Sequence, residues 1–231
     1  MVDNVEDNQW SGVFVTGQGS RVDVEGGSVS GSEVGSGIIA GEGGRAVVTG
    51  VRVEDNQHSG VVADGPGSQV EVAGGSVTGS FRGVSAWEGG RAVVTGVRVE
   101  DNQQCGVFAH GRGSRVEVEG GSVSGSKEYD GIGAAEGGHA VVTGVRVEDN
   151  QRCGVVAHGP GSQVEVAGGS VSGSKEGDGI LAAGGGHAVV KDVQVSNCAR
   201  YGLYRAGDDS HMEVGDGVTI RGCGRGDRHG C

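Results

Sequence analysis

Apolar residues recur at every second position in short runs along nearly the whole chain. Between Gly89 and Arg112, three runs follow one another around Val94, Val99 and Val107, and glycine or a polar cluster separates each run from the next. A period of two over so few residues predicts short strands and not helices. The abundance of valine and glycine agrees, because valine favours strands and glycine disfavours the interior of a helix.

The same pattern returns along the chain with little change. The stretch GGRAVVTGVRVEDNQ begins at Gly43 and at Gly89, and it returns at Gly137 with His in place of Arg. Residues 89–136 and 137–184 differ at nine positions, and each such block divides into two halves with the same pattern. The repeating unit is therefore about 24 residues long and contains three strands.

Three strands per unit predict that each unit forms one coil of a solenoid. Neighbouring coils would stack at the ~4.8 Å spacing of paired strands, so that equivalent residues lie above one another. Valine fills two such columns and is expected to point inward. The first column is Val24, Val48, Val72, Val94, Val118, Val142, Val166, Val190 and Val214, and the second is Val29, Val53, Val77, Val99, Val123, Val147, Val171 and Val195.

We therefore expect an all-β, parallel β-helix solenoid of about nine coils with three short parallel sheets. The pattern predicts a single domain over residues 1–231. The coils at 1–18 and 209–231 are irregular and lack an obvious cap, as the ends of a piece of a longer solenoid would. Uncapped ends also suggest end-to-end or domain contacts.

The repeat, written GxxVxVxGxxVxxN…GVxxxG, resembles the repeats of right-handed parallel β-helices of the pectin-lyase-like family. The resemblance covers nearly the whole chain and implies right-handed coils. Leucine-rich repeats have a similar period but fit less well, because the chain has only Leu181 and Leu203. The resemblance further implies that a ligand lies across the third strand of each coil, which follows the longest and most variable turn.

Two outward columns of the third strand form what we call the third-strand stripe. One column is Phe14, Ile39, Val62, Ser85, Phe108, Gly133, Val156, Leu181 and Tyr204, and the other is Thr16, Gly41, Asp64, Trp87, His110, Ala135, His158, Ala183 and Ala206. An exposed apolar and aromatic stripe indicates a binding face, a packing face for a neighbouring domain or chain, or a tolerated valine-rich surface. The predicted binding residues for a polysaccharide or protein ligand are Phe14, Trp87, Phe108, His110, His158 and Tyr204, with Tyr129 in the preceding turn.

Catalysis is the alternative to a non-catalytic binding module. The motifs NTD, GHG, RIK and DPH, which carry chemistry in the resembling enzymes, do not occur here. The remaining candidates for a polysaccharide lyase, epimerase or hydrolase are Asp130, His110 and His158. The alignment of coils places Asp130 ~16 Å from His158 and His110 ~10 Å from His158. Because a catalytic site needs one unique constellation whereas these coils are copies, the sequence favours binding.

Composition narrows the function classes. The 52 glycines have no G-X-Y period, which excludes collagen, and the net charge of −12 argues against a nucleic-acid surface. No run reaches the ~18 to 20 consecutive apolar residues of a membrane span, and the N-terminus lacks the apolar stretch of a signal peptide. We expect no nucleic-acid or membrane partner and no cofactor, while the compartment stays open.

A metal site is not expected from the sequence. His139 and His187 take the places of Arg45 and Arg91 in one polar column, so the exchange of one cation for another is the simpler interpretation.

The turn after the second strand carries a further column. Asn56, Asn102 and Asn150 alternate there with Ser80 and Ser126, and we interpret them as turn residues and not as ligands. Two of the five cysteines, Cys198 and Cys223, continue this column one coil apart, which is close enough for a disulfide in an oxidising compartment. Cys105 and Cys153 occupy equivalent positions of two repeats.

Overall fold

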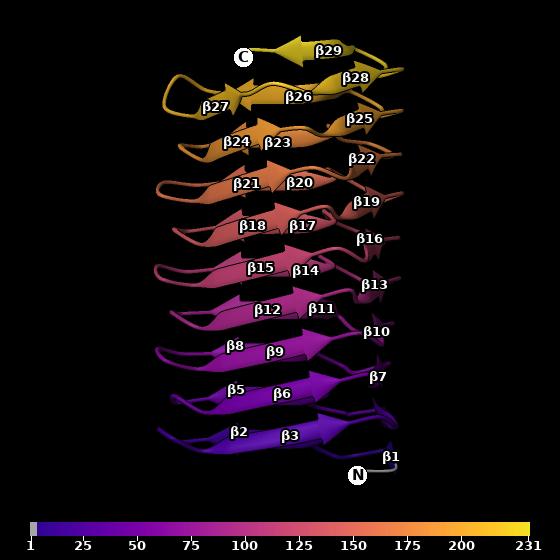
Figure 1. Ribbon diagram of the computed structural model, residues 1–231, viewed down its shortest axis with the longest axis vertical. Coiled ribbons are helices and arrows are strands. Elements are labelled where there is room, and N and C mark those ends of the chain that lie inside the picture. Colours follow the sequence, from indigo (N-terminus) through magenta and orange to yellow (C-terminus); the bar gives the residue numbers. More distant parts are fainter. Residues whose placement is uncertain (1–3) are drawn as a thin grey trace.

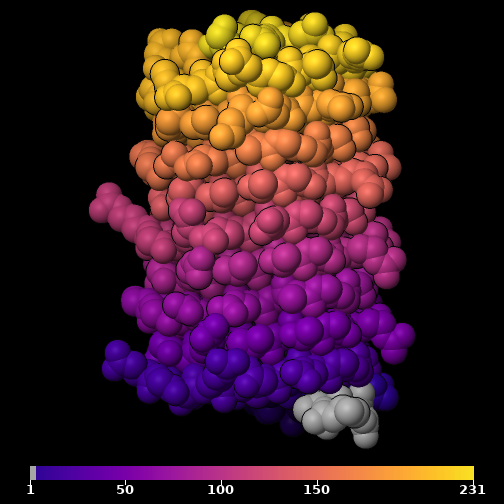
Figure 2. Space-filling model, viewed as in Figure 1, coloured from indigo at the N-terminus to yellow at the C-terminus, as the bar shows by residue number. Residues whose placement is uncertain are grey.

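The structure, a computed structural model, describes residues 4–231 as a stack of coils in which every element is a strand. Each coil contributes one strand to each of three sheets, and the chain climbs from one end of the stack to the other (Figure 1). The molecule is elongated along the stacking direction (Figure 2). The expectation of an all-β parallel solenoid with coils of about 24 residues is confirmed.

We name the sheets after the place of their strands in the repeat. The first-strand sheet contains β3 (Arg21–Glu25), β6 (Arg45–Thr49), β9 (Gln69–Ala73), β12 (Arg91–Thr95), β15 (Arg115–Glu119), β18 (His139–Thr143), β21 (Gln163–Ala167), β24 (His187–Lys191) and β27 (His211–Val214). The second-strand sheet contains β1 (Asn4–Val5), β4 (Ser28–Ser30), β7 (Arg52–Glu54), β10 (Ser76–Thr78), β13 (Arg98–Glu100), β16 (Ser122–Ser124), β19 (Arg146–Glu148), β22 (Ser170–Ser172), β25 (Gln194–Ser196) and β28 (Thr219–Arg221). The third-strand sheet contains β2 (Val13–Thr16), β5 (Ile38–Gly41), β8 (Ser59–Asp64), β11 (Arg82–Trp87), β14 (Val107–His110), β17 (Ile132–Ala135), β20 (Val155–His158), β23 (Ile180–Ala183), β26 (Tyr201–Ala206) and β29 (Gly226–His229).

The coils stack in the register that the sequence predicts. Val94 pairs in parallel with Val72 below it and with Val118 above it, and Val99 pairs with Val77 and Val123. Both predicted valine columns are buried along most of their length and form one continuous core. The core is narrow, and the third-strand sheet adds its largest side chains, Ile38, Ile132, Ile180 and Leu203, all fully buried.

The column of asparagine and serine satisfies backbone groups at the turn after the second strand. The side-chain oxygen of Asn56 accepts from the backbone N–H of Ser32, the hydroxyl of Ser80 accepts from that of Asn56, and Asn102 accepts from that of Ser80. Because these polar groups are buried, each hydrogen bond avoids the cost of an unpaired group. The predicted turn role is confirmed.

Cys198 and Cys223 end this column as predicted. Ser196 pairs with Arg221, which places the two cysteines, each two residues further on, one above the other. All five cysteines of the chain are free thiols in the structure, so the disulfide stays a prediction. Along residues 4–231 there is no helix long and apolar enough to cross a membrane.

Candidate functional site

The third-strand stripe follows the predicted register, but it is exposed only in part, because Val62, Ser85, Gly133 and Val156 of its first column are buried. Phe14 pairs with Ile39 at one end, and the same column reaches Leu181 and Tyr204 at the other. Phe14 is 62% exposed, whereas Trp87, Phe108 and Tyr204 are half-buried against their neighbours. The stripe is therefore a surface with relief and not a flat row of side chains.

Aromatic rings gather at the middle of the stripe, in what we call the Trp87 cluster. The ring of Trp87 lies edge-on to Phe108 with centroids 5.7 Å apart, and its centroid is 4.6 Å from that of His110. The guanidinium of Arg82 lies 5.1 Å from the Trp87 ring and 5.0 Å from the ring of Phe81. Cation–π and edge-to-face contacts of this kind hold the five side chains together.

A cavity of about 590 Å³ lies on the C-terminal side of the cluster. Its walls include Arg82, Phe108, Tyr129, Asp130, Arg152, His158 and Arg200. The floor is built from small residues: Ala134 and Ala135 follow Gly133, where any side chain would collide with the Phe108 ring. A second hollow of about 520 Å³ lies on the N-terminal side, between Trp10, His58 and Trp87. The volume of the cavity on the C-terminal side lies within the range that suits a small ligand or a few sugar units.

Asp130 comes from the residue position directly before the third strand. Its Oδ1 accepts a hydrogen bond of 2.8 Å from the backbone N–H of Cys153, on the next coil. Burial raises the pKa of Asp130, although that hydrogen bond and the charges of Arg152 and His158 act in the opposite direction. A carboxyl group with a raised pKa holds its proton at higher pH and can donate it, as a general acid must.

Asp178 holds the equivalent position two coils further on. Its Oδ1 accepts a hydrogen bond of 2.9 Å from the backbone N–H of Tyr201, and the side chain is fully buried. Within the described chain Oδ2 makes no hydrogen bond, and the nearest cation, Arg200 Nη1, is 3.7 Å away. Burial raises the pKa of Asp178, and because the carboxyl has no exposed surface it does not reach the cavity.

Cys105 and Cys153 occupy the same position, on the coil before Asp130 and on the coil between Asp130 and Asp178. Burial raises the pKa of Cys105 to about 12 and also raises the pKa of Cys153 far above its usual value. The thiolate is the nucleophilic form of cysteine, and these side chains hold it in negligible amount at neutral pH. They line the cavity as apolar groups and not as nucleophiles.

Three arginines surround the cavity, and each lies against an aromatic ring. The Arg152 guanidinium is 5.3 Å from the Tyr129 ring, Arg200 is 5.3 Å from the Tyr204 ring, and Arg82 belongs to the Trp87 cluster. Glu176 and Asp130 are the acids in the wall. In a chain with a net charge of −12, this is a local concentration of positive charge.

The structure brings some of the predicted site residues together and separates others. One cavity is lined by Phe108, Tyr129, Asp130 and His158. The distance of ~16 Å expected between Asp130 and His158 from the strand spacing therefore does not exclude a shared site. Trp87 and His110 lie beside it in the Trp87 cluster. Phe14 lies on β2, near the N-terminal end of the sheet, and Tyr204 packs near the C-terminal end with Tyr201 and His229.

Sequence analysis missed the arginines of the cavity. Arg82 lies one residue before the glycine that opens the third strand, and Arg152 and Arg200 lie two residues before it. The signal was present, because the repeats carry neutral residues at most of these positions. Arg152 and Arg200 lie in the turn before the third strand and Arg82 is the first residue of β11, so none of the three falls in an outward strand column of the repeat.

The expectation of no metal cluster was also incomplete. Side-chain ligand atoms of His187, His211 and Glu213 all lie within 4.8 Å of one another on the first-strand sheet. His211 follows His187 in the column that also holds Arg45 and Arg91, and this succession of two histidines is the sequence signal for the cluster.

Comparisons with known proteins agree with the fold. The sequence model of the family described as right handed beta helix region matches residues 3–123 and 36–186. A search of curated proteins found no match.

Two solved structures are similar in shape. One is the catalytic domain of a GH87 α-1,3-glucanase in complex with tetrasaccharides, at 8% identity and a TM-score of 0.47, covering 94% of this chain and 60% of that one. The other is a mutant of the periplasmic alginate epimerase AlgG, at 12% identity and a TM-score of 0.48, covering 94% of this chain and 76% of that one. The chain thus spans about three fifths of the length of the glucanase domain. With the family model matched over most of its length, the chain belongs to the right handed beta helix region family.

Proposed function

We propose that the chain is a β-helix binding module that holds an acidic oligosaccharide across the third-strand stripe. The observation that carries the proposal is the cavity of about 590 Å³, ringed by Arg82, Arg152 and Arg200. The proposal extends the stripe predicted from the sequence, with the ligand narrowed to a carboxylated glycan.

Charge supports an anionic ligand. A guanidinium pairs with a carboxylate through two parallel hydrogen bonds, which fixes orientation as well as adding energy. The rest of the surface carries a large excess of acids, so an anion is repelled elsewhere and attracted at this cavity.

The rings support a sugar chain. Phe108 and Tyr129 line the cavity, and Trp87 lies next to it over the neighbouring hollow. Pockets of this type bury a ligand mainly against apolar and aromatic surface and use a few polar groups to orient it. The stripe continues past the cavity along the long axis of the molecule, which gives an extended chain a path from one coil to the next.

A carbohydrate-active enzyme is the second candidate, and Asp130 is the observation that favours it. Its carboxyl lies in the cavity wall, has a raised pKa and shares the cavity with His158. A hydrolase needs a second carboxylate in reach of the same glycosidic bond, and Glu176 is the other acid that lines the cavity. We rank this candidate second because three arginines line the wall and, of its two acids, Glu176 is exposed to solvent.

Calorimetric titration of oligogalacturonates tests binding, with their methyl esters as neutral counterparts. We expect binding of the acids and not of the esters. Because a hydrogen bond to a charged group contributes about 1.5–3 kcal/mol, Arg152→Gln and Arg200→Gln should each weaken binding about ten-fold or more. Arg98→Gln, an exposed arginine of β13 on another sheet, is the matched control. Equal binding of acids and esters would contradict the proposal.

The enzyme candidate is tested with the same oligosaccharides. Release of reducing ends or unsaturated products by the unchanged protein, abolished in Asp130→Asn, would place catalysis ahead of simple binding. Binding without product, unaffected by Asp130→Asn, would leave the binding module as the function.

A further inference from the structure

The outward face of the first-strand sheet carries two polar columns two residues apart. The first is Arg21, Arg45, Gln69, Arg91, Arg115, His139, Gln163, His187 and His211, and the second is Asp23, Val47, Glu71, Val93, Glu117, Val141, Glu165, Val189 and Glu213. In every second coil the basic residue reaches the glutamate of the coil that follows.

These cross-coil pairs form a series. Arg45 lies 2.7 Å from Glu71, and Arg91 lies 2.9 Å from Glu117. His139 lies 3.1 Å from Glu165. The first pair is one cation beside one carboxylate, whereas Arg115 lies 2.6 Å both from Glu117 and from His139 Nδ1.

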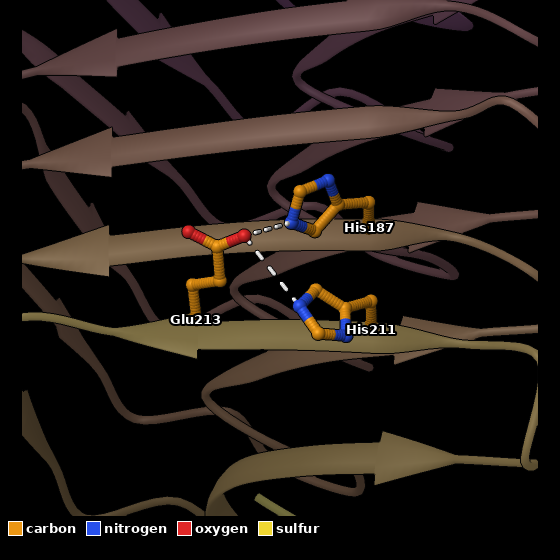
Figure 3. Close-up of side chains that lie close together, drawn as sticks. All are labelled: His187, His211 and Glu213. Atoms are coloured by element: carbon orange, nitrogen blue, oxygen red, sulfur yellow. Dashed lines mark ion pairs between the residues drawn. The ribbon is translucent and has the colours of Figure 1, made fainter.

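The last pair of the series differs. His187 Nε2 lies 3.4 Å from Glu213 Oε1, and His211 Nε2 lies 3.5 Å from the same oxygen. Figure 3 shows both imidazole rings directed at one carboxylate from neighbouring strands, and their centroids are 5.0 Å apart at an angle of 60°. Glu117 also meets two basic groups, but both are guanidiniums, whereas the two groups at Glu213 are imidazoles, which can bind a metal cation.

Hydrogen bonding does not account for this arrangement. Among residues 4–231, His187 Nε2 is enclosed and has no hydrogen-bond partner, although Glu213 is near. Ligand atoms bound to one tetrahedral zinc at ~2.0–2.1 Å are about 3.4 Å from one another. The two nitrogen-to-oxygen separations, 3.4 and 3.5 Å, match the edge of such a tetrahedron.

We propose that His187, His211 and Glu213 bind a late first-row divalent cation of the Zn²⁺ type. Two imidazoles and one carboxylate form a donor set that suits zinc, and hard cations such as Mg²⁺ and Ca²⁺ prefer oxygen ligands. The side chains of His211 and Glu213 are 65% and 59% exposed, so the fourth position of the cation faces solvent and takes water.

The cation would tie β27 to β24. β27 is the last strand of the first-strand sheet among the described residues, and it has a partner on one side only. A cation that binds the folded coil and not the unfolded chain stabilises it by mass action. The site lies on a different sheet from the cavity, so it stands independently of the proposed glycan binding.

The chain contains a matched comparison for this site. His139, Gln163 and Glu165 hold the equivalent positions two coils earlier, with Gln163 in place of His211. There the cation Arg115 lies 2.6 Å from His139 Nδ1, whereas the residue below His187 is the neutral Gln163. This second trio has one imidazole and one carboxylate and is not expected to bind zinc.

Zinc titration of the chelator-treated protein, followed by calorimetry and by elemental analysis, tests the proposal. We expect one Zn²⁺ per chain and no binding of Mg²⁺. Since even outer-shell partners of zinc ligands contribute about ten- to hundred-fold in affinity, His211→Gln should weaken binding by at least about ten-fold. His139→Gln, the matched control, should leave affinity and stoichiometry unchanged. No saturable binding, or equal binding by the His211→Gln protein, would overturn the proposal.

A gain of function tests it from the other direction. The double variant Arg115→Gln/Gln163→His gives the earlier trio the same three ligand types as the later one and the same neutral residue below it. We expect two Zn²⁺ per chain and an additional rise in the zinc-dependent melting temperature. A stoichiometry that stays at one, with the far-ultraviolet circular dichroism unchanged, would show that this constellation does not suffice and would refute the assignment.

Discussion

The outward faces of the first-strand and third-strand sheets differ in how regularly they repeat. On the first-strand sheet, basic and acidic residues follow one another in a fixed order, and even His139 keeps the pairing that Arg45 and Arg91 make. On the third-strand sheet, large and small residues follow without order, as Phe108 beside Gly133 illustrates. The regular face carries paired charges, whereas the irregular face has cavities.

The two most similar blocks show where coils are free to diverge. Residues 89–136 and 137–184 differ at nine positions. Four of these place a cavity-lining residue in at least one block: Gln104 and Arg152, Phe108 and Val156, Tyr129 and Gly177, Gly133 and Leu181. In two more, His139 replaces Arg91 and Gln163 replaces Arg115. Both positions lie in the column that continues to His187 and His211. Six of the nine differences thus lie at the cavity or in the column that continues to His187 and His211.

The largest loss of stability is expected from a substitution in the core, which both faces cover. Val142 is buried in the core, and its neighbour Val141 points outward on the same strand. Val142→Ser removes apolar volume and buries a hydroxyl, which should destabilise the protein by about 2–4 kcal/mol. Val141→Ser should cost less than about 1 kcal/mol. Equal losses in urea unfolding would show that the strand register is wrong.

A smaller effect is expected from the buried acid behind the irregular face. Burial raises the pKa of Asp178 in the folded protein, so the folded state binds its proton more tightly than the unfolded state. That contribution to stability is complete below the ordinary aspartate pKa of about 3.9 and is lost as the pH rises through the raised value.

Asp178→Asn should therefore reduce the fall in stability between acid and neutral pH, measured by urea unfolding across that range. Asp208→Asn, an exposed aspartate of the turn before β27, serves as the control and should change the profile less than Asp178→Asn does. A profile that Asp178→Asn leaves as steep as before would argue against burial as the cause.

The Trp87 cluster should contribute less again. Trp87→Ser removes the ring contacts with Phe108 and His110, and aromatic pairs contribute about 0.5–1.5 kcal/mol each. We expect a loss of about 1 kcal/mol in unfolding free energy and a larger relative loss of oligosaccharide binding. If stability fell as far as in Val142→Ser, Trp87 would be part of the core and not of a binding face.

The smallest effect is expected at the thiols of the irregular face. Because burial raises the pKa of Cys105 to about 12, Cys105 should remain unmodified when the native protein is treated with iodoacetamide. The exposed Cys231 should be alkylated under the same conditions, as peptide mass spectrometry can show. Alkylation of Cys105 at the rate of Cys231 would mean that the cavity opens.

A related measurement concerns the stacked pair at the end of the asparagine and serine column. After oxidation, non-reducing mass spectrometry should find Cys198 joined to Cys223, because their coils are in register. A bridge from Cys198 to Cys231 would contradict that register.

The sequence predicted the columns well because they depend only on period. The period places Val94 in the core and Trp87 on the outside of its sheet, and both placements are confirmed. The cavity could not be found in this way, because it arises where Ala135 follows His110 in one column and the turn before the strand supplies Asp130 and Arg152. Periodicity assigns a residue to a column. It does not show where a small side chain beside a large one leaves a hollow, or which side chains of the adjoining turn line that hollow.

The alternation of asparagine and serine at the turn also limits how such a chain can grow. Asn56, Ser80 and Asn102 each meet the other residue type in the next coil, so the ladder has a period of two coils. Removing one coil would stack two asparagines or two serines, with crowding in one case and a gap in the other. Removing or adding a pair, about 48 residues, leaves every partner in place. Tandem duplication of a two-coil block is therefore the step by which this molecule can change its length without losing its ladder.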